Sequence, residues 1–589
     1  MTDSLPIHAV LPELLAALDS AGCAVLIAPP GAGKTTAVAP ALLDEAWCIG
    51  LVILLSPRRV AARAAAERMA EMLGEPVGER IGYVTRLDAR QSAATRILVV
   101  TEAIFVARIL ADPELAGVSA VLFDEAHERH LDSDLGLALA IESRSVLRED
   151  LRIVVMSATI DGARFARLLQ DAPAIESAGR AHPLRIEWLG SSAEQRPDEA
   201  VASAVLTAWR DEQGDVLAFL PGVGEIERTR ERLVERLPEV PILPLHGQVE
   251  PAAQRAAIRR DPDGRRRIVL ATSIAETSLT LDGVSVVVDG GLARRAEFDL
   301  AAGVTHLVTH RASQAAAAQR AGRAARQGPG VAYRLWEQAA HAGREPFDPP
   351  EMLTADLAPL VLALAQWGAD SLSLAWLDPP PAAALAAART RLEKLGALVL
   401  RQSEEGRSWT ITELGRKIAA LAMAPWQAAM LLFGAGHRQA LEAAKLALLL
   451  QERGLGGRGE DLAQRLARWN ADRSPRAAAA RKLAESWARK VERLNPANEA
   501  TVPVGVLLAR ALPDNLARRR GASGESWLSA GGRGYSLDPA SPLATAEWLA
   551  IGDAQGRAQA ARITAALALT TQEVETHLAE QVERRATLR

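Results

Sequence analysis

The chain has 589 residues, 49% of them hydrophobic, and a formal net charge of −4 at pH 7. Its length exceeds what one hydrophobic core holds, so several domains are expected, and it has no apolar run long enough for a membrane helix. The presence of only two cysteines excludes a disulfide framework and a four-cysteine zinc site, and it favours the reducing cytoplasm. Because the net charge is slightly negative, a nucleic-acid partner would have to bind a local basic surface.

Short apolar runs alternate with helical stretches through the first half of the chain. This alternation is typical of βα units that build a parallel sheet. The expected strands of a first domain are Ala24–Ala28, Leu51–Ser56, Ile97–Thr101, Val121–Asp124 and Ile153–Ser157. Residues 184–189 begin a connector, and the expected strands of a second domain are Asp215–Leu220, Ile242–Leu245, Ile268–Thr272 and Val284–Asp289. The sequence therefore predicts two successive α/β domains with a boundary at 180–200.

The pattern changes in the second half of the chain. A hairpin is expected between Arg294 and His310, although an ordinary extension of the sheet would have the same pattern. Helical patterns rich in Ala and Leu follow from Pro350 onward. After Pro513, short strands with glycine turns are expected at Ser526–Ala530, Gly534–Leu537, Glu547–Gly552 and Arg562–Leu567. These strands favour a small barrel.

A glycine-rich segment follows the first expected strand. Gly31–Thr35 reads Gly-Ala-Gly-Lys-Thr and supplies the phosphate-facing half of the pattern G-x-x-x-x-G-K-[ST], while Ala28 stands at the first glycine of that pattern. A helix that begins near Lys34 would direct its N-terminal N–H groups at a phosphate. The alternative is a chance Gly/Pro turn between a strand and a helix.

Two acids end another expected strand about ninety residues later. Asp124 and Glu125 follow the apolar run Val121–Phe123, so they lie at the carboxyl end of a parallel sheet, where α/β proteins bind ligands. Such acids can hold a metal ion and activate a water. An Asp-Glu pair alone would more often be a solvated acidic turn, and a zinc site is disfavoured because the chain has no H-E-x-x-H helix. The phosphate loop and the acids together predict nucleotide hydrolysis.

With these two segments, further parts of the chain resemble the motifs of DEAH-box helicases, and they point to the bacterial HrpB-type branch. Besides Asp124-Glu125-Ala126-His127, the segments that carry the resemblance are Pro57–Arg63, Ser157-Ala158-Thr159, Phe219–Gly222, Ala271–Thr280 and Gln319–Arg326. The resemblance is most specific over residues 25–330 but covers the whole chain. In that branch a further C-terminal domain follows the barrel, for which this sequence has no residues before it ends at Arg589.

The resemblance implies an α/β fold with two tandem RecA-like parallel-sheet domains, followed by winged-helix, helical-bundle and OB-like domains. The expected bounds are 1–188 for the ATP-binding RecA-like domain, 189–348 for the second RecA-like domain, 349–424 for the winged helix, 425–512 for the ratchet-like bundle, 513–576 for the barrel and 577–589 for a C-terminal tail.

The resemblance also implies the residues that bind and hydrolyse ATP, with Mg²⁺ as the cofactor. Glu125 would polarise the attacking water and Gln319 would orient it, while Thr35 and Asp124 would hold the Mg²⁺. Arg323 and Arg326, three apart on one face of a helix, would direct positive charge at the γ-phosphate. The implied ATP-binding residues are Ala28, Pro29, Pro30, Gly31, Ala32, Gly33, Lys34, Thr35, Thr36 and Arg68, and the residues that would couple the nucleotide to domain closure are His127, Ser157 and Thr159.

Two departures from the family pattern bear on activity. The adenine slot would lie between Arg68 and Leu292, and because Leu292 replaces an aromatic residue, weak base selectivity is expected. Ala325 stands where the family has glycine, which would weaken turnover if that position requires a positive φ.

A nucleic-acid track is expected at Arg58, Arg59, Thr101 and Thr272. Arginine side chains and threonine hydroxyls there would bind phosphates, which carry no sequence information. The alternative for Arg58 and Arg59 is a solvated surface cap.

Taken together, the sequence predicts a cytoplasmic ATP-dependent RNA helicase that couples Mg-ATP hydrolysis to 3′→5′ translocation on single-stranded RNA and to duplex unwinding. The alternatives are an RNA-binding ATPase clamp or remodelling scaffold that does not unwind, and a DNA translocase. No membrane association is expected, and the sequence leaves the oligomeric state open.

Overall fold

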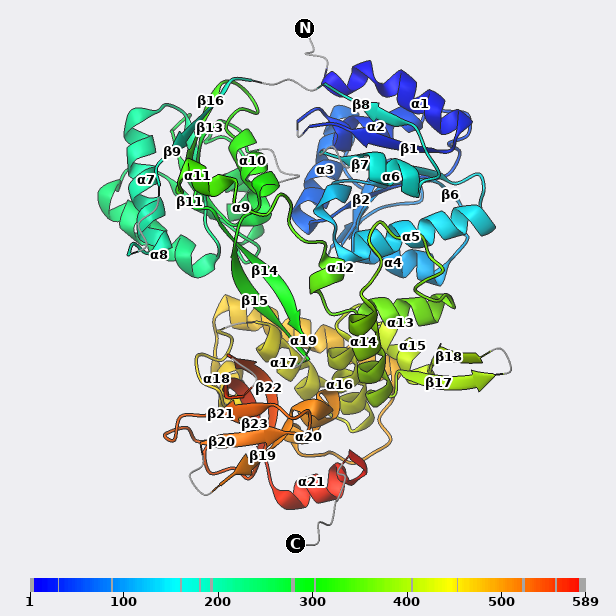
Figure 1. Cartoon of the computed structure of the whole chain (residues 1–589), viewed down its shortest axis with the longest axis vertical. Coiled ribbons are helices and arrows are strands. Elements are labelled where there is room, and N and C mark those ends of the chain that lie inside the picture. The colour runs from blue at the N-terminus through cyan, green and yellow to red at the C-terminus, as the bar shows by residue number, and fades with distance from the viewer. Residues whose placement is uncertain are drawn as a thin grey trace. The chain divides into compact units, whose positions relative to one another are not determined.

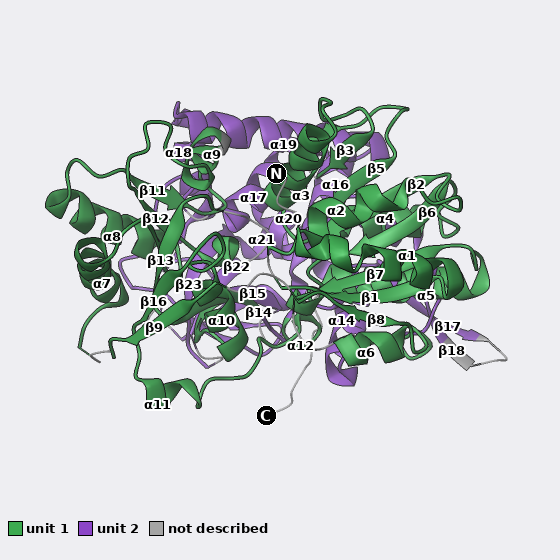
Figure 2. Cartoon of the chain, turned by 90° about the horizontal axis from the view of Figure 1, so that it is seen from above, with its two compact units in different colours: residues 1–296, 307–354, 372–379 green, residues 297–306, 355–371, 380–589 purple. Residues whose placement is uncertain are grey.

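The computed structural model describes residues 5–29, 31–85, 88–158, 162–178, 182–190, 194–276, 281–300, 303–403, 406–452, 454–521, 525–556 and 559–581. The chain divides into two compact units, which Figure 2 distinguishes by colour. Unit 1 comprises residues 1–296, 307–354 and 372–379, and unit 2 comprises residues 297–306, 355–371 and 380–589. Unit 1 contains two lobes, each built on a parallel sheet.

The first lobe, blue to cyan in Figure 1, is an eight-stranded sheet in the order β4-β3-β5-β2-β6-β7-β1-β8. Neighbouring strands run parallel except for β3 and β4. Its strands are β1 Cys23–Ile27, β2 Leu51–Ser56, β3 Ile81–Val84, β4 Ala89–Arg90, β5 Ile97–Thr101, β6 Val118–Phe123, β7 Arg152–Ser157 and β8 Ala174–Glu176. Its helices are η1 Pro6–Ala9, α1 Leu11–Ser20, α2 Lys34–Leu42, α3 Arg59–Met72, α4 Glu102–Ala111, η2 Ala126–Glu128, α5 Leu131–Val146 and α6 Gly162–Leu168.

Helices cover both faces of this sheet. Ala24 and Leu26 of β1 are fully buried in an apolar core that includes residues of α1, α2 and α3. The alternate residue Ile27 faces α6 so closely that a Cβ on Gly162 would lie 2.3 Å from its Cδ1. Because both faces are covered, the central strands are near-continuous apolar runs, and that is why the sequence predicted β1, β2, β5, β6 and β7. The strands β3, β4 and β8 were not predicted.

The second lobe is a six-stranded parallel sheet in the order β11-β12-β10-β13-β16-β9. Its strands are β9 Leu184–Trp188, β10 Asp215–Phe219, β11 Ile242–Leu245, β12 Ile268–Ala271, β13 Val284–Asp289 and β16 Gly330–Arg334. Its helices are α7 Pro197–Asp211, α8 Val223–Arg236, α9 Pro251–Ile258, η3 Ser273–Ala275, α10 Gln314–Gly322 and α11 Gln338–His341. The short helix α12 Glu351–Thr354 follows in unit 1 and contacts the first lobe, where the Glu351 N–H donates to the Arg129 carbonyl at 3.1 Å.

The expectation that residues 184–189 begin a connector is wrong. They form β9, which pairs with β16 from Leu184 opposite Gly330 to Trp188 opposite Arg334. The second sheet therefore begins before the boundary expected after residue 188. As an edge strand, β9 is partly exposed and carries polar residues such as Arg185 and Glu187, so it lacks the apolar run of a central strand.

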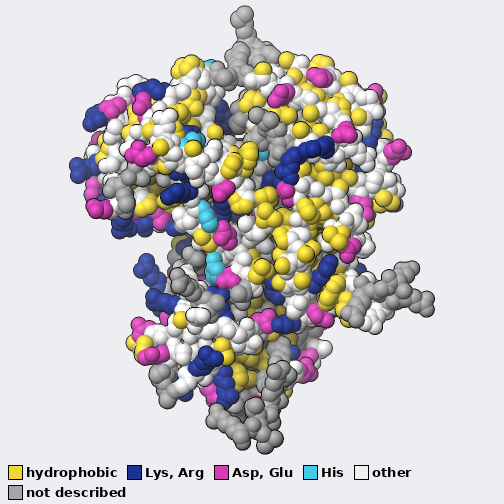
Figure 3. Space-filling model, in the orientation of Figure 1, with side chains coloured by type: hydrophobic (Ala, Val, Ile, Leu, Met, Phe, Trp, Pro, Cys, Tyr) yellow, Lys and Arg dark blue, Asp and Glu magenta, His cyan; other side chains and the backbone are white. Residues whose placement is uncertain are grey.

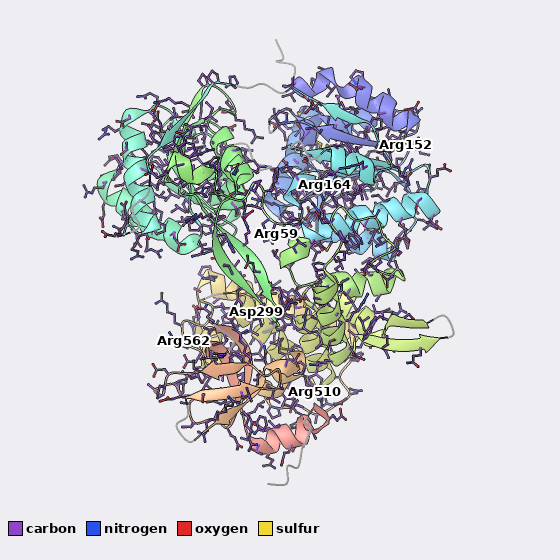
Figure 4. All side chains as sticks on the ribbon, viewed as in Figure 1. Arg59, Arg152, Arg164, Asp299, Arg510 and Arg562 are labelled. Carbon is purple, nitrogen blue, oxygen red and sulfur yellow. The ribbon has the colours of Figure 1, made fainter. Side chains whose placement is uncertain are left out.

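The expected hairpin is confirmed. Strands β14 Leu292–Asp299 and β15 Val304–Arg311 form a separate two-stranded sheet, and the tip, residues 297–306, groups with unit 2. Within unit 2, Arg533 donates a hydrogen bond to Asp299, labelled in Figure 4, at 2.8 Å. The guanidinium of Arg391 lies 4.4 Å from the ring centroid of Phe298.

The remainder of unit 2 is helical up to a closed five-stranded barrel in the order β19-β20-β21-β23-β22. Three helices with an antiparallel two-stranded wing come first: α13 Ala358–Trp367, α14 Ala382–Lys394, β17 Leu398–Ser403, β18 Gly406–Ile411 and α15 Glu413–Ala419. The bundle helices are α16 Pro425–Gly436, α17 Ala440–Gln451, α18 Leu462–Ala471, α19 Pro475–Leu494 and α20 Val504–Ala511. The barrel region consists of η4 Pro513–Asn515, β19 Leu516–Arg520, β20 Ser526–Ser529, β21 Gly534–Ser536, β22 Trp548–Gln555, β23 Ala561–Leu569, α21 Thr571–His577 and η5 Ala579–Gln581.

The fold class expected from the sequence is confirmed, since two parallel sheets precede the helical and barrel regions. The barrel contains one strand that the sequence did not predict, β19, whose Leu-Ala-Arg-Arg-Arg composition is unlike that of a buried strand. In the part of the chain that the structure describes, no helix is both long enough and apolar enough to span a membrane.

Candidate nucleotide and nucleic-acid site

The glycine-rich segment forms a loop between β1 and α2. Gly31 and Gly33 have φ values of 91° and 99°, so two positions of the loop require the left-handed region that glycine adopts without strain. Ala28 does not have a positive φ, is fully buried and donates its N–H to the Ser157 carbonyl at 2.9 Å. The alanine therefore fits its backbone position, and Gly33 caps a helix whose first residue is Lys34.

The loop and the acids at the end of β6 meet as the sequence predicted. Lys34 is only 4% exposed, and its Nζ lies 2.8 Å from Glu125 Oε2 and 4.0 Å from Asp124 Oδ1. The Thr35 hydroxyl donates to Asp124 Oδ2 at 2.5 Å. Glu125 itself has a positive φ of 54°, a strained conformation of the kind that clusters at functional sites.

Burial and charge set the protonation of these groups. Burial and the neighbouring charge of Glu125 raise the pKa of Asp124 to about 7. Burial alone would raise the pKa of Glu125, but the charge and the hydrogen bond of Lys34 lower it below its usual value. Although burial disfavours the Lys34 ammonium, Glu125 and Asp124 raise its pKa. Glu125 is therefore a carboxylate that can accept a hydrogen bond from water.

The oxygens beside Lys34 fit a magnesium ion. A hydroxyl and a carboxylate, from Thr35 and Asp124, lie within hydrogen-bond distance of one another, and hard oxygen donors are what Mg²⁺ prefers. Mg²⁺ binds through one or two such protein groups plus phosphate oxygens and water. These two residues are therefore suited to hold it next to the phosphate loop.

His127 connects the acids of the first lobe to the second lobe. Its Nδ1 accepts the Ala158 N–H at 3.2 Å, and its Nε2 lies 2.8 Å from the side-chain amide of Gln319. Burial lowers the pKa of His127, so the ring is neutral with its proton on Nε2. The Gln319 atom at 2.8 Å is Nε2, so the side-chain amide must be turned to present its oxygen for Gln319 to accept that proton. Ser157, at the end of β7, is fully buried beside the phosphate-loop strand.

Arg323 and Arg326 lie near the acids, but the expectation that one helix carries both arginines is wrong. Helix α10 ends at Gly322, so Arg323 is its C-cap and Arg326 follows it. Arg323 Nε donates to the Glu276 carbonyl at 2.9 Å, and Arg326 Nε would lie 3.2 Å from a Cβ placed on Gly31. The turn after α10 thus brings Arg326 directly against the phosphate loop.

Burial makes these arginines poorly solvated cations. It lowers the pKa of Arg323 well below its usual value, and the charge of Arg326 adds to the effect. Burial likewise lowers the pKa of Arg326, which the charge of Glu125 opposes. The negative charge of a bound phosphate would offset the energetic cost of burying these two cations. Ala325 between them does not have a positive φ, so the alanine costs no backbone strain there.

The structure does not show the two residues of the predicted adenine slot in contact with each other. Arg68 forms an ion pair with Glu71 on its own helix at 2.7 Å, and Leu292 begins β14, half-buried. The adenine slot therefore stays a prediction. Pro30 and Thr159 lie outside the described residues.

The predicted nucleic-acid residues follow adjacent strands. Ser56 pairs with Thr101 in register, so Arg58 and Thr101 stand at the same edge of the first sheet. In the second lobe, Thr272 follows Ala271, which pairs with Phe219. Basic side chains are dispersed among acidic ones on the face drawn in Figure 3, so phosphate binding depends on such local positions.

Arg58 and Arg59 differ in their surroundings. Arg58 is 22% exposed, lies 3.3 Å from Glu128 Oε2, and donates to the Ser273 carbonyl of the second lobe at 2.5 Å. Arg59, labelled in Figure 4, is exposed at the first turn of α3. Arg59 is therefore the more available of the two for a phosphate.

The sequence analysis gave no role to a buried arginine within the segment Gln319–Arg326. Arg320, 1% exposed, pairs with Glu276 at 2.5 Å and with Asp289 at 2.7 Å, and donates to the Leu292 carbonyl at 3.1 Å. Arg320 therefore connects α10 to Glu276, which follows η3, and to the start of β14. Its place directly after Gln319 was the available signal, but in an arginine-rich chain that signal is weak.

Known proteins share this arrangement. Residues 8–168 match the family model described as DEAD/DEAH box helicase, and residues 198–328 match that of the helicase conserved C-terminal domain. The chain is 42% identical over 556 residues to the ATP-dependent RNA helicase HrpB of Escherichia coli, covering 93% of this chain and 66% of that protein. It is 34% identical over 434 residues to the pre-mRNA-splicing factor ATP-dependent RNA helicase prp22 of Schizosaccharomyces pombe, covering 72% and 36%.

A solved structure extends the likeness to three dimensions. A crystal structure of the Escherichia coli DEAH/RHA helicase HrpB aligns with a TM-score of 0.85 at 40% identity, over 97% of this chain and 71% of that one. The chain spans about two thirds of the length of HrpB and about a third of that of prp22.

Proposed function

We propose that this chain, which belongs to the DEAD/DEAH box helicase family, hydrolyses ATP in a reaction that RNA stimulates. One observation carries the proposal: the buried residues Lys34, Asp124 and Glu125 and the half-buried Thr35 form a single connected set beyond the carboxyl ends of β1 and β6. That set contains a cation for phosphate, oxygens for a metal ion and a carboxylate for water. Those are the parts that phosphoryl transfer to water requires.

The residues divide the work of hydrolysis. The N–H groups of the phosphate loop and the Lys34 ammonium bind the β- and γ-phosphates, which displaces Lys34 from Glu125. Glu125 then polarises the attacking water, and Gln319 orients it. Thr35 and Asp124 would hold Mg²⁺, which would supply positive charge to balance the charge that develops on the phosphate. Arg323 and Arg326 stabilise the transition state from the second lobe, a contribution of about 10³–10⁵ in rate for one arginine finger.

We further propose that the two lobes alternate between closed and open states and so move along single-stranded RNA from 3′ to 5′ and separate duplexes. His127 and Gln319 link the lobes beside the acids, and the phosphate-binding candidates Arg58 and Thr272 stand on opposite lobes. Opening one base-pair step of DNA costs about 1.4 kcal/mol, a step small enough for a hydrolysis cycle to bias. RNA is the substrate named for HrpB and prp22. The proposed compartment is the cytoplasm.

The experiment is an ATPase assay without nucleic acid, with single-stranded RNA and with single-stranded DNA, run beside strand-displacement assays on duplexes with a 3′ or a 5′ overhang. Stimulation by RNA and displacement from the 3′ overhang are the expected results. RNA stimulation without displacement would leave an ATPase clamp or remodelling scaffold, and stimulation by DNA alone would make the chain a DNA translocase. The absence of hydrolysis under all conditions would overturn the proposal.

A further inference from the structure

A half-buried histidine that the proposed reaction does not use, His130, bridges two carboxylates. It directly precedes α5, its Nδ1 lies 3.2 Å from Glu102 Oε2, and its Nε2 lies 3.3 Å from Glu128 Oε2. The side chains of Glu102 and Glu128 are each 11% exposed. Because each ring nitrogen faces a carboxylate, both must carry a hydrogen, and the ring is an imidazolium.

The surroundings of His130 favour this charged form. Burial opposes the charge, but the hydrogen bond and charge of Glu102, followed by the charges of Glu128 and Glu351, raise the pKa of His130 to about 10. Glu351 is held next to the ring by the Leu131 N–H, which it accepts at 2.9 Å. A cation among these three acids keeps them from repelling one another.

From Glu128 the contacts continue into the second lobe. Glu128 Oε2 also lies 3.3 Å from Arg58 Nη2, and Arg58 donates through Nη1 to the carbonyl of Ser273. Burial disfavours the charge on Arg58, while Glu128 and Glu276 raise its pKa. The result is a continuous chain of charge-assisted contacts, Glu102–His130–Glu128–Arg58–Ser273, which joins α4 of one lobe to η3 of the other.

Both ends of this chain of contacts adjoin a proposed nucleic-acid residue. Glu102 directly follows Thr101, and Ser273 directly follows Thr272. In its middle, Glu128 belongs to the same short helix η2 as His127, which contacts Gln319. A displacement at the nucleic-acid edge therefore has a physical route to the groups beside the nucleotide.

We propose that His130 is a positioning residue that couples nucleic-acid binding to ATP turnover. It holds Glu102 and Glu128 in place, so that Glu128 keeps the Arg58 side chain in contact with Ser273 of the second lobe. The inference rests on the proposed function, because it requires hydrolysis that RNA stimulates. Within the described residues, His130 forms no hydrogen bond or ion pair with the phosphate loop or with Asp124 and Glu125, so it acts through its two carboxylate partners.

The test compares the full chain with His130→Gln in ATPase assays at increasing concentrations of single-stranded RNA. Glutamine keeps a hydrogen-bond donor but removes the charge and one of the two contacts. The ratio of RNA-stimulated to basal kcat is expected to fall about tenfold, while basal kcat and the KM for ATP stay within about twofold. Loss of stability alone would lower basal and stimulated kcat together.

The matched control is His437→Gln in unit 2. His437 is a buried histidine whose Nε2 likewise faces a carboxylate, at 3.0 Å from Glu499. This variant is expected to keep the wild-type ratio. In a double-mutant cycle, His130→Gln and Arg58→Ala are expected to be non-additive in the stimulated kcat, since both act through Glu128.

Each outcome bears on the proposal. A wild-type chain that RNA does not stimulate would overturn both the proposed function and this inference. A stimulated wild-type chain with an unchanged ratio in His130→Gln, or an additive cycle, would overturn the inference alone. If His130→Gln does not fold, Glu102→Gln decides, because it neutralises one end of the same bridge and carries the same expected tenfold loss.

Discussion

The side-chain amide of Gln319 lies 2.8 Å from Nε2 of His127, so the segment Gln319–Arg326 of the second lobe directly contacts the Asp-Glu-Ala-His segment of the first lobe. The other ring nitrogen is already occupied by the Ala158 N–H, one residue past β7. The imidazole is therefore held from both sides. A movement of the second lobe would displace His127, whose Nδ1 lies 3.6 Å from Glu125 Oε2.

This contact predicts non-additive mutations. His127→Ala and Gln319→Ala should each lower RNA-stimulated kcat, and the double variant should lose less than the sum by about 1 kcal/mol, the size of one net hydrogen bond. The measurement is kcat for all four proteins at saturating RNA. Additive losses would mean that the two side chains act separately.

Lys34→Ala should abolish ATP hydrolysis, with a loss in kcat of at least about 100-fold. The reason is that the phosphates lose the one cation that is buried within the loop itself. Phosphate release is the measurement, and Lys445→Ala, a change at a lysine of the helical bundle, is the control. Hydrolysis within tenfold of wild type would contradict the role given to Lys34.

Glu125→Gln should still bind ATP but stall its turnover. Glutamine keeps the size of the side chain and an oxygen for Lys34, but it removes the charge that polarises water, so kcat should fall about 10²–10⁴-fold. A fluorescent ATP analogue measures binding, which should stay within about threefold of wild type. Near wild-type turnover would show that another group activates the water.

Hydrolysis should accept all four common nucleoside triphosphates. Because Leu292 offers no aromatic face to a base, ATP, GTP, CTP and UTP should support kcat/KM within about tenfold of one another, or 1.4 kcal/mol. Leu292→Phe should increase the preference for purines, since a ring can stack on the base. A hundredfold preference for ATP in the wild-type chain would reveal a base-reading contact elsewhere.

Arg58 and Arg59 should separate in their salt dependence. Arg59 is exposed, so Arg59→Ala should reduce the slope of log K against log salt for single-stranded RNA by about 0.7, one phosphate contact. Arg58 already contacts Glu128 and Ser273, so Arg58→Ala should change the slope less than Arg59→Ala does. Fluorescence anisotropy at several salt concentrations provides both slopes, and equal slopes in all three proteins would show that the track runs elsewhere.

Much of the nucleotide site could be predicted from the sequence because its parts are local. A buried parallel strand followed by Gly31–Thr35 and a helix forms a phosphate loop whatever surrounds it, and Asp124 and Glu125 necessarily stand at the carboxyl end of their own strand. The central parallel strands of both lobes could be predicted for a similar reason, since burial on both faces demands continuous apolar runs. The strands β3, β8 and β16 were not predicted.

Only the tertiary structure decided what depends on partners distant in the chain. It gave β9 to the second sheet, because an edge strand carries too little apolar sequence to be recognised. It ended α10 at Gly322, so a turn and not a helix face brings Arg326 against Gly31. It also tied Arg58 to Glu128 and Ser273 and enclosed His130 between two acids, since charge and burial at a side chain come from the neighbours that folding supplies.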